Sequence, residues 1–326
     1  MKNETDAAAK SGGLPIAVFV VVAFALAWLI ALPLWFGDGL QSANARTLMT
    51  AMMFAPTAAA LITVFFIEKP KHKARALGLV PLRPAGRLIG YLALGLVLPV
   101  LLTLAALVVG SWLGLFPADF IHFSGFQQLL ELSGQADLPV PLGVLVASQF
   151  LNVLIAALFV NILPALGEEI GWRGWLLPKL LRFGPWPAIL LSGAIWGLWH
   201  APIILLGYNY PGTPGWLAVL AMVGSCIVLG GIFGWLRLRG GSVWPAALAH
   251  SSLNAAATLF VVFYERDGVF DPLHANITGW SGWIVPAILL VVIVAAKKFT
   301  PFVPAPKPAR EPAPEPRSAA ESAPAE

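Results

Sequence analysis

The chain has 326 residues, of which 58% are hydrophobic and only 11% are charged. A soluble domain carries about 25% charged residues, so this composition excludes a soluble globular fold and indicates a membrane protein. The formal net charge is +4, but the lysines and arginines stand in short segments between apolar runs and form no dense basic patch. We therefore interpret them as determinants of membrane topology and expect no nucleic-acid partner.

Apolar runs long enough to cross a bilayer recur along the chain. A transmembrane helix needs about 20 mostly apolar residues, because each residue adds about 1.5 Å across a hydrocarbon core of about 30 Å. The runs lie at residues 15–36, 47–67, 88–116, 140–166, 187–207, 215–236, 243–264 and 279–296. The sequence predicts an all-α fold, a polytopic membrane helix bundle of about eight transmembrane helices. The Gly- and Pro-rich turn at 207–215 makes the fifth and sixth spans an antiparallel pair.

The basic residues orient this bundle, because cytoplasmic loops hold the excess of lysine and arginine. The connection between the second and third spans carries six of them, whereas the connection at 117–139 carries none. Eight spans then place both termini in the cytoplasm and leave Arg46 and Arg266 as the only basic residues on the outer side. We expect the protein in the cell (plasma) membrane, in contact with the lipid bilayer.

The sequence divides into three regions. Residues 1–14 are predicted to form a cytoplasmic N-terminus and residues 15–300 a multi-pass membrane domain. Residues 301–326 are rich in Pro, Ala and Glu, and this composition predicts a disordered cytoplasmic tail. The single cysteine, Cys226, lies within an apolar run and is interpreted as a small core residue.

Ionisable residues at membrane depth indicate where function resides, since each costs about 2.5–3.5 kcal/mol on insertion scales. The first such cluster is Gly-Glu-Glu-Ile-Gly-Trp-Arg, residues 167–173. Glu169 and Arg173 stand four residues apart, a spacing at which they attract on a helix, so we expect Arg173 to neutralise Glu169. Glu168 then points elsewhere and is free to act as a general base. The alternative is a charge cluster that anchors a span end at the interface.

Two further clusters supply histidines. Trp196 and His200 share a helix face in the fifth span, and His250 and Asn254 share one in the seventh. Separately, such residues are typical of hydrogen bonds between membrane helices. Together with Glu168 they contain the parts of a hydrolytic site, a base that activates water and donors that stabilise an oxyanion. The other polar residues within spans are interpreted as helix-packing groups: Gln149, Asn152, Asn161, Ser192 and Ser225.

The three clusters resemble the motifs of a known family. They read Glu-Glu-x-x-x-Arg, aromatic-x-x-x-His and His-x-x-x-Asn, in this order on successive membrane segments, and this set is similar to that of the CAAX protease and bacteriocin-processing family. The family, also called the Abi or type II CAAX prenyl endopeptidase family, consists of intramembrane proteases with about eight helices. The matched stretch runs from Pro164 to Asn254, and Trp196 stands where the family often has phenylalanine. The resemblance implies a protease core at about residues 140–264.

The resemblance also implies an activity and a role for each residue. The expected activity is hydrolysis of a peptide bond at the membrane, in a peptide or protein substrate that includes lipidated ones. The implied roles are activation of water by Glu168 and His200, stabilisation of the oxyanion by His250 and Asn254, and support of the site by Glu169, Arg173 and Trp196.

The resemblance leaves a metal cofactor open. The family is often labelled metalloprotease, and Glu168, His200 and His250 can bind zinc as a His₂Glu set that leaves one position for water. The chain lacks His-Glu-x-x-His, in which two ligands share one helix by construction. We favour a mechanism without a permanent metal.

The depths of the two histidines pose a geometric problem. His200 lies about 13 residues into its span from the cytoplasmic side and His250 only about 7, a difference that straight, upright helices do not align. Pro164, Gly167 and Gly171 can bend the fourth segment. We therefore predict a kinked fourth helix and a buried cavity that opens to the cytoplasmic half.

Two other functions use the same residues. A non-catalytic membrane binding or immunity protein would keep the motif as a structural network. A proton-coupled small-solute transporter would use the glutamates and histidines as a proton relay, although the sequence shows no inverted-repeat halves of the kind typical of transporters.

Overall fold

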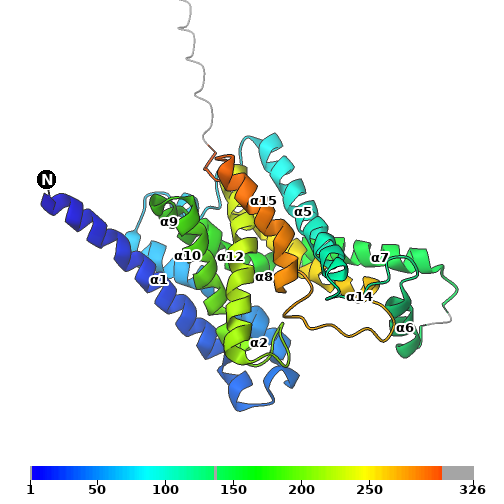
Figure 1. Cartoon of the computed structure of the whole chain (residues 1–326). Helices are drawn as coiled ribbons and strands as arrows, with labels where there is room; N and C mark the ends of the chain where they lie inside the picture. Colours follow the sequence, from blue (N-terminus) through cyan, green and yellow to red (C-terminus); the bar gives the residue numbers. More distant parts are fainter. Residues whose placement is uncertain (1, 136–137, 303–326) are drawn as a thin grey trace, which may run out of the picture.

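The computed structural model describes residues 2–135 and 138–302, with side chains from residue 13 onward (Figure 1). These residues form helices and their connections, and the only extended pairing among them is an isolated bridge between Ala118 and Tyr264. The predicted all-α fold is confirmed for this part of the chain. All but the first two residues of the predicted tail at 301–326 lie outside the described residues.

The α-helices fall into long and short elements. The long elements are α1 (Lys2–Phe36), α5 (Ala85–Trp112), α7 (Leu142–Ile155), α10 (Pro185–Trp199), α12 (Gly215–Gly240), α13 (Trp244–Ala256) and α15 (Ile284–Ala295). The short α-helices are α2 (Ala45–Met52), α3 (Ala55–Ile62), α4 (Lys73–Ala76), α6 (Ser124–Leu132), α8 (Ile162–Glu169), α9 (Leu177–Leu180), α11 (Ala201–Ile204) and α14 (Phe260–Phe263). Three further segments are π-helices: η2 (Thr63–Glu68), η3 (Ala156–Val160) and η4 (Ile170–Leu176). Four are short 3-10 helices: η1 (Gly39–Gln41), η5 (Leu181–Phe183), η6 (Ala257–Leu259) and η7 (Trp280–Trp283).

Much of this helical structure is long and apolar enough to cross a membrane. Six stretches of the described chain qualify: Gly13–Phe36, Ala45–Glu68, Ala85–Trp112, Leu142–Val160, Gly215–Gly240 and Trp244–Phe263. Side chains on them such as Val21, Phe66 and Phe159 are exposed, as expected for residues that face lipid instead of water. The chain is therefore a multi-pass membrane protein.

The other two predicted spans are shorter than expected. The predicted span at 187–207 is divided, because α10 ends at Trp199 and α11 begins after His200. Pro202 explains the division, since its ring lacks the N–H that would continue the helical ladder. The last apolar helix covers only Trp280–Ala295.

The fourth predicted span is kinked, as the sequence suggested. α7 runs into the π-helical segment η3, the chain bends at Asn161, and α8 continues to Glu169 before a second π-helical segment, η4. Pro164 lacks the N–H that would bond to the carbonyl of Val160, so regular α-helical bonding fails at this point. The break places Glu168 on a separate short helix inside the bundle.

α10 and α12 form the predicted antiparallel pair. Gly193 faces Ile227 and Gly197 faces Val223, so the register runs in opposite directions along the two helices. The backbones approach so closely at both glycines that a Cβ would collide with the partner backbone. Small residues four apart allow this contact in membrane helices, where van der Waals packing drives association.

α13 crosses the centre of the bundle and is fixed on two sides. The Ser251 hydroxyl donates to the carbonyl of Ala157 at 2.6 Å, and the Ser252 hydroxyl donates to the carbonyl of Leu96 at 2.6 Å. These bonds join α13 to η3 and to α5. Because they lie on the same turns as His250, they hold that side chain in place.

Hydrogen bonds between connections define two ends of the molecule. At one end the amide N–H of Val243 donates to the carbonyl of Gly78, and Lys179 pairs with Glu68 at 2.5 Å. We call this the basic end, because most of the described lysines and arginines lie here. The opposite end, which we call the acidic end, joins the connections before α2, α7 and α12 and before η7 (Figure 1).

Candidate active site

Glu168 is buried and is held by two indole rings. The Nε1–H of Trp196 donates to its Oε2 atom at 2.6 Å, and the Nε1–H of Trp172 donates to the same atom at 3.3 Å. Within the described residues Glu168 forms no ion pair. The carboxylate is thus oriented by neutral donors and is not neutralised by a cation, as a general base requires.

The neighbouring Glu169 points to a different set of partners. Its Oε1 atom accepts from Arg173 Nη1 at 2.7 Å and lies 3.0 Å from Nδ1 of His250. The predicted pairing of Glu169 with Arg173 is therefore present, with both side chains fully buried. The Arg173 guanidinium also stacks on the Trp196 ring at 4.0 Å, a cation–π contact inside the bundle.

Both histidines are oriented through Nδ1. In His200 this atom lies 2.9 Å from the backbone carbonyl of Trp196, and in His250 it lies beside the Glu169 carboxylate. A carbonyl or carboxylate oxygen only accepts, so Nδ1 carries the hydrogen in each ring. The Nε2 atom of each ring is then left for a ligand or water.

Trp196 connects the parts of the site. Its ring centroid lies 5.7 Å from that of His200 and 5.4 Å from that of His250. The same indole donates to Glu168 and covers Arg173. The two histidines, which the sequence places at different depths, therefore both lie against the ring of one side chain.

These residues border one cavity with a volume of about 340 Å³. Glu168, His200, His250 and Asn254 all line it, and the Asn254 side chain is exposed to it. Asn161 and Ser225, which the sequence indicated as helix-packing groups, line the cavity as well. The four predicted catalytic side chains share one chamber.

The cavity opens at the acidic end. Its outer lining comes from Arg46, Tyr208, Asn209 and Thr278, which belong to connections of that end or to the helix turn beside them. The expectation that it opens to the half carrying the basic loops is wrong. The loop that follows α11 contributes Tyr208 and Asn209 to the lining on this side.

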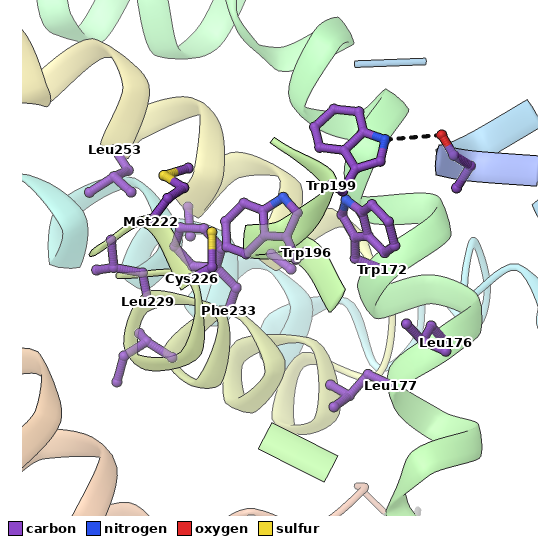
Figure 2. Packing of buried hydrophobic residues seen from close by; sticks show 14 of the residues in the cluster. Trp172, Leu176, Leu177, Trp196, Trp199, Met222, Cys226, Leu229, Phe233 and Leu253 are labelled. Atoms are coloured by element: carbon purple, nitrogen blue, oxygen red, sulfur yellow. Dashed lines mark hydrogen bonds between the residues drawn. The ribbon is translucent and has the colours of Figure 1, made fainter. Parts of the chain in front are cut away.

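Apolar side chains close the site on its other faces. Figure 2 shows Trp172 next to Trp199, and Trp196 beside Cys226 and Phe233 from α12. The dashed bond in Figure 2 joins Nε1 of Trp199 to the carbonyl of Ala23 at 3.2 Å. This bond attaches the wall of the site to α1. A dry wall of this kind strengthens electrostatic interactions within the cavity.

Trp172 was not among the site residues predicted from the sequence. It stands four residues after Glu168, the spacing that signalled the Glu169–Arg173 pair, and the same rule applied to an indole donor would have identified it. Gly230 was missed as well. A Cβ at Gly230 would come within 2.5 Å of Arg173 Nη2, so glycine leaves the space that the guanidinium occupies.

The described residues do not form a metal-binding cluster. No group of three or more His, Cys, Asp or Glu side chains with the geometry to hold a metal ion is found in residues 2–135 and 138–302. Glu168, His200 and His250 line one cavity without forming such a group, and Glu168 Oε2 is already bound by two indoles. The arrangement does not fit a His₂Glu zinc site.

Comparison with known proteins agrees with the motifs and the geometry. Residues 150–256 match the family model described as type II CAAX prenyl endopeptidase Rce1-like. A curated relative, CAAX prenyl protease 2 of Methanococcus maripaludis (strain S2), is 29% identical over 106 residues. The alignment covers 31% of this chain and 39% of that protein. Both matches support a relationship of this chain to the CAAX protease and bacteriocin-processing family.

The Rce1-like match covers most of the residues that line the cavity. It begins in α7 and ends with α13, and so includes Glu168, His200, His250 and Asn254. The helices before α7 contribute Arg46 and the methionines of α2 to the cavity from outside the matched stretch. The entrance to the cavity is therefore built in part by residues that the comparison does not cover.

Proposed function

We propose that the chain is an intramembrane endopeptidase of the CAAX prenyl protease type, which hydrolyses a peptide bond with a water molecule activated by Glu168. The observation that carries the proposal is the convergence of Glu168, His200, His250 and Asn254 on one buried cavity. The substrate is a peptide or protein segment at the membrane, with or without a lipid anchor. The proposed location is the cell (plasma) membrane, with both termini in the cytoplasm.

The first step of the proposed reaction is attack by water. The Glu168 carboxylate takes a proton from a water molecule while Nε2 of His200 accepts the hydrogen bond from its other hydrogen. The oxygen of this water bonds to the carbonyl carbon of the scissile peptide, and the C=O electron pair moves to oxygen. General-base assistance of this kind contributes about 10²–10⁴-fold to the rate.

The second step is collapse of the tetrahedral intermediate. The Asn254 amide donates a hydrogen bond to the oxyanion, and a protonated His250 ring donates through Nε2–H while its Nδ1–H stays bonded to Glu169. The C–N bond then breaks, and the leaving amine takes the proton that Glu168 holds. Glu169 stabilises the charged His250 ring, and Arg173 holds Glu169 in position.

The test compares purified wild-type protein with Glu168→Gln on a library of lipidated and unlipidated peptides. The amide keeps the shape of the side chain but does not take a proton, so cleavage should fall by about 10²–10⁴-fold. Glu265→Gln is the matched control, because Glu265 is an exposed carboxylate outside the cavity; its activity should equal that of wild type.

Two outcomes contradict the proposal. Full activity in Glu168→Gln would remove the residue from the chemistry. Absence of cleavage by wild-type protein across the library would favour a non-catalytic membrane protein that keeps the motif as a structural network. Repeating the assay with a chelator and with added zinc would show whether a metal contributes.

A further inference from the structure

The two ends of the molecule differ in charge. Twelve described lysines and arginines lie in the connections and helix ends of the basic end: Lys69, Lys71, Lys73, Arg75, Arg83, Arg87, Lys179, Arg182, Arg237, Arg239, Lys297 and Lys298. Direct contacts hold this end together, since Arg87 Nε donates to the carbonyl of Arg239 at 2.6 Å and its guanidinium stacks on Phe302 at 3.7 Å. Four separate connections thus gather their positive charge on one face.

The acidic end has the opposite composition. Its connections carry Asp38, Asp119, Glu131, Glu265, Asp267 and Asp271. Within the described residues, Arg46 and Arg266 are its only lysines or arginines, and Arg266 is paired with Glu131 at 2.6 Å. Hydrogen bonds such as Tyr210 to the carbonyl of Thr278, at 2.9 Å, join the connections of this end.

The entrance of the cavity lies on the acidic end. Tyr208 and Asn209 belong to the loop between α11 and α12, and Thr278 belongs to the loop before η7. Figure 1 shows α2 and the loop before α12 at the lower end of the molecule, whereas α9 and the start of α5 lie at the upper end. None of the basic-end residues named above lines the cavity.

The charge difference between the two ends and the position of the entrance together indicate the side of the membrane from which the site is reached. Short loops rich in lysine and arginine stay in the cytoplasm, so the basic end faces the cytoplasm and the cavity opens away from it. We propose that the site receives its substrate from the non-cytoplasmic face of the membrane. This inference rests on the proposed function and narrows its substrates to peptide segments that have been exported or that emerge from the bilayer on the outer side.

The entrance also indicates the chemistry of such a segment. Met49, Met52, Met53 and Met222 line the cavity, and methionine provides a flexible apolar surface that adapts to different side chains. Arg46 is the only lysine or arginine in the lining. These features suit an apolar segment of variable sequence, whose acidic groups, where it has any, would lie near Arg46 at the mouth.

The first experiment determines the side without any need for activity. In a Cys226→Ala background, which removes the only cysteine of the chain, single cysteines are introduced as Asn209→Cys at the mouth and Arg75→Cys at the basic end. Ser133→Cys, an exposed position after α6 on the acidic end, is the matched control away from the mouth. Intact cells are treated with a charged maleimide that does not cross membranes.

The proposal expects labelling of Asn209→Cys and Ser133→Cys in intact cells, and of Arg75→Cys only after the cells are permeabilised. The reverse pattern overturns the proposal. Labelling of all three in intact cells overturns it as well, because it would mean that the protein adopts both orientations.

The second experiment tests access together with chemistry. The water-soluble peptide that detergent-solubilised protein cleaves best is placed either outside or inside sealed right-side-out membrane vesicles, with Glu168→Gln as the inactive reference. Cleavage of the outer peptide alone supports the proposal. Cleavage of the enclosed peptide alone overturns the inferred side while the proposed function stands, whereas absence of cleavage even in detergent contradicts the proposed function itself.

Discussion

The hydrogen bond from Trp196 to Glu168 yields the sharpest prediction. Trp196→Phe removes the Nε1–H that donates to the carboxylate at 2.6 Å, and it keeps an aromatic ring between Arg173 and the two histidines. A hydrogen bond to a charged group contributes about 1.5–3 kcal/mol. Only the longer bond from Trp172, at 3.3 Å, remains to stabilise the ionised form of Glu168.

This loss should appear in the pH dependence of peptide cleavage. One pH unit corresponds to 1.36 kcal/mol, so the acidic limb of the kcat/KM profile should move to higher pH by about one to two units. Above that limb the activity should stay within about tenfold of wild type, because a less stabilised carboxylate is a stronger base. The measurement is kcat/KM of purified protein across the pH range in which the bundle stays folded.

Trp199→Phe is the matched control for this prediction. Trp199 is 1% exposed and Trp196 is 4% exposed, but the Nε1–H of Trp199 donates to the carbonyl of Ala23 and not to the site. Its pH profile should coincide with that of wild type. An unshifted limb in Trp196→Phe, or an equal shift in both variants, would refute the assignment of Glu168 as the titrating base.

Three other predictions concern stability, the oxyanion and the acidic end. Arg173→Met leaves the buried Glu169 carboxylate without its cation, which costs about 3–5 kcal/mol, so thermal unfolding in detergent should begin at a clearly lower temperature; an unchanged transition would contradict this. Asn254→Ala removes an amide exposed to the cavity, so kcat should fall about 10²–10³-fold with the unfolding transition unchanged, and full kcat would exclude the amide from the mechanism. The backbone N–H of His122 is the main cause that holds the pKa of Asp119 well below its ordinary value. The ionised Asp119 carboxylate therefore stabilises the loop fully above about pH 3.9, and this stabilisation is lost as the pH falls below that value. Hydrogen exchange should detect the loss, and Asp119→Asn should abolish this pH dependence.

Contacts within one helix were the part of the site that the sequence could predict. The Glu169–Arg173 pair follows from a spacing of four residues, and the shared face of His250 and Asn254 follows from the same geometry. Each depends on local helical spacing, and the Glu169–Arg173 pair forms even though Arg173 lies in the π-helical segment η4. Tertiary packing does not alter such relations, so they survive in the folded protein.

Contacts between different helices could not be predicted from the sequence. The indole of Trp196 reaches Glu168 across 28 positions of the chain, and no local spacing encodes that approach. The helix α6 (Ser124–Leu132) was not predicted either, because it lies in a stretch that the sequence suggested only as a connection. The end at which the cavity opens depends on how α10, α12 and the loops pack together, and hydropathy does not report this.

The depth mismatch between the histidines has a structural resolution. His200 lies where α10 ends and the chain turns into α11, so its ring projects from a break and not from the side of a continuous helix. His250 lies on α13, whose two serine hydroxyls bind it to η3 and α5.

The ring of Trp196 lies next to both histidines, with centroid distances of 5.7 Å to His200 and 5.4 Å to His250. The same indole donates to Glu168 at 2.6 Å, a hydrogen bond that a phenylalanine ring does not supply, and the Arg173 guanidinium stacks on it at 4.0 Å. Trp196 therefore joins the general base, the two histidines and the buried Glu169–Arg173 pair through one side chain, although these residues come from α8, η4, α10 and α13.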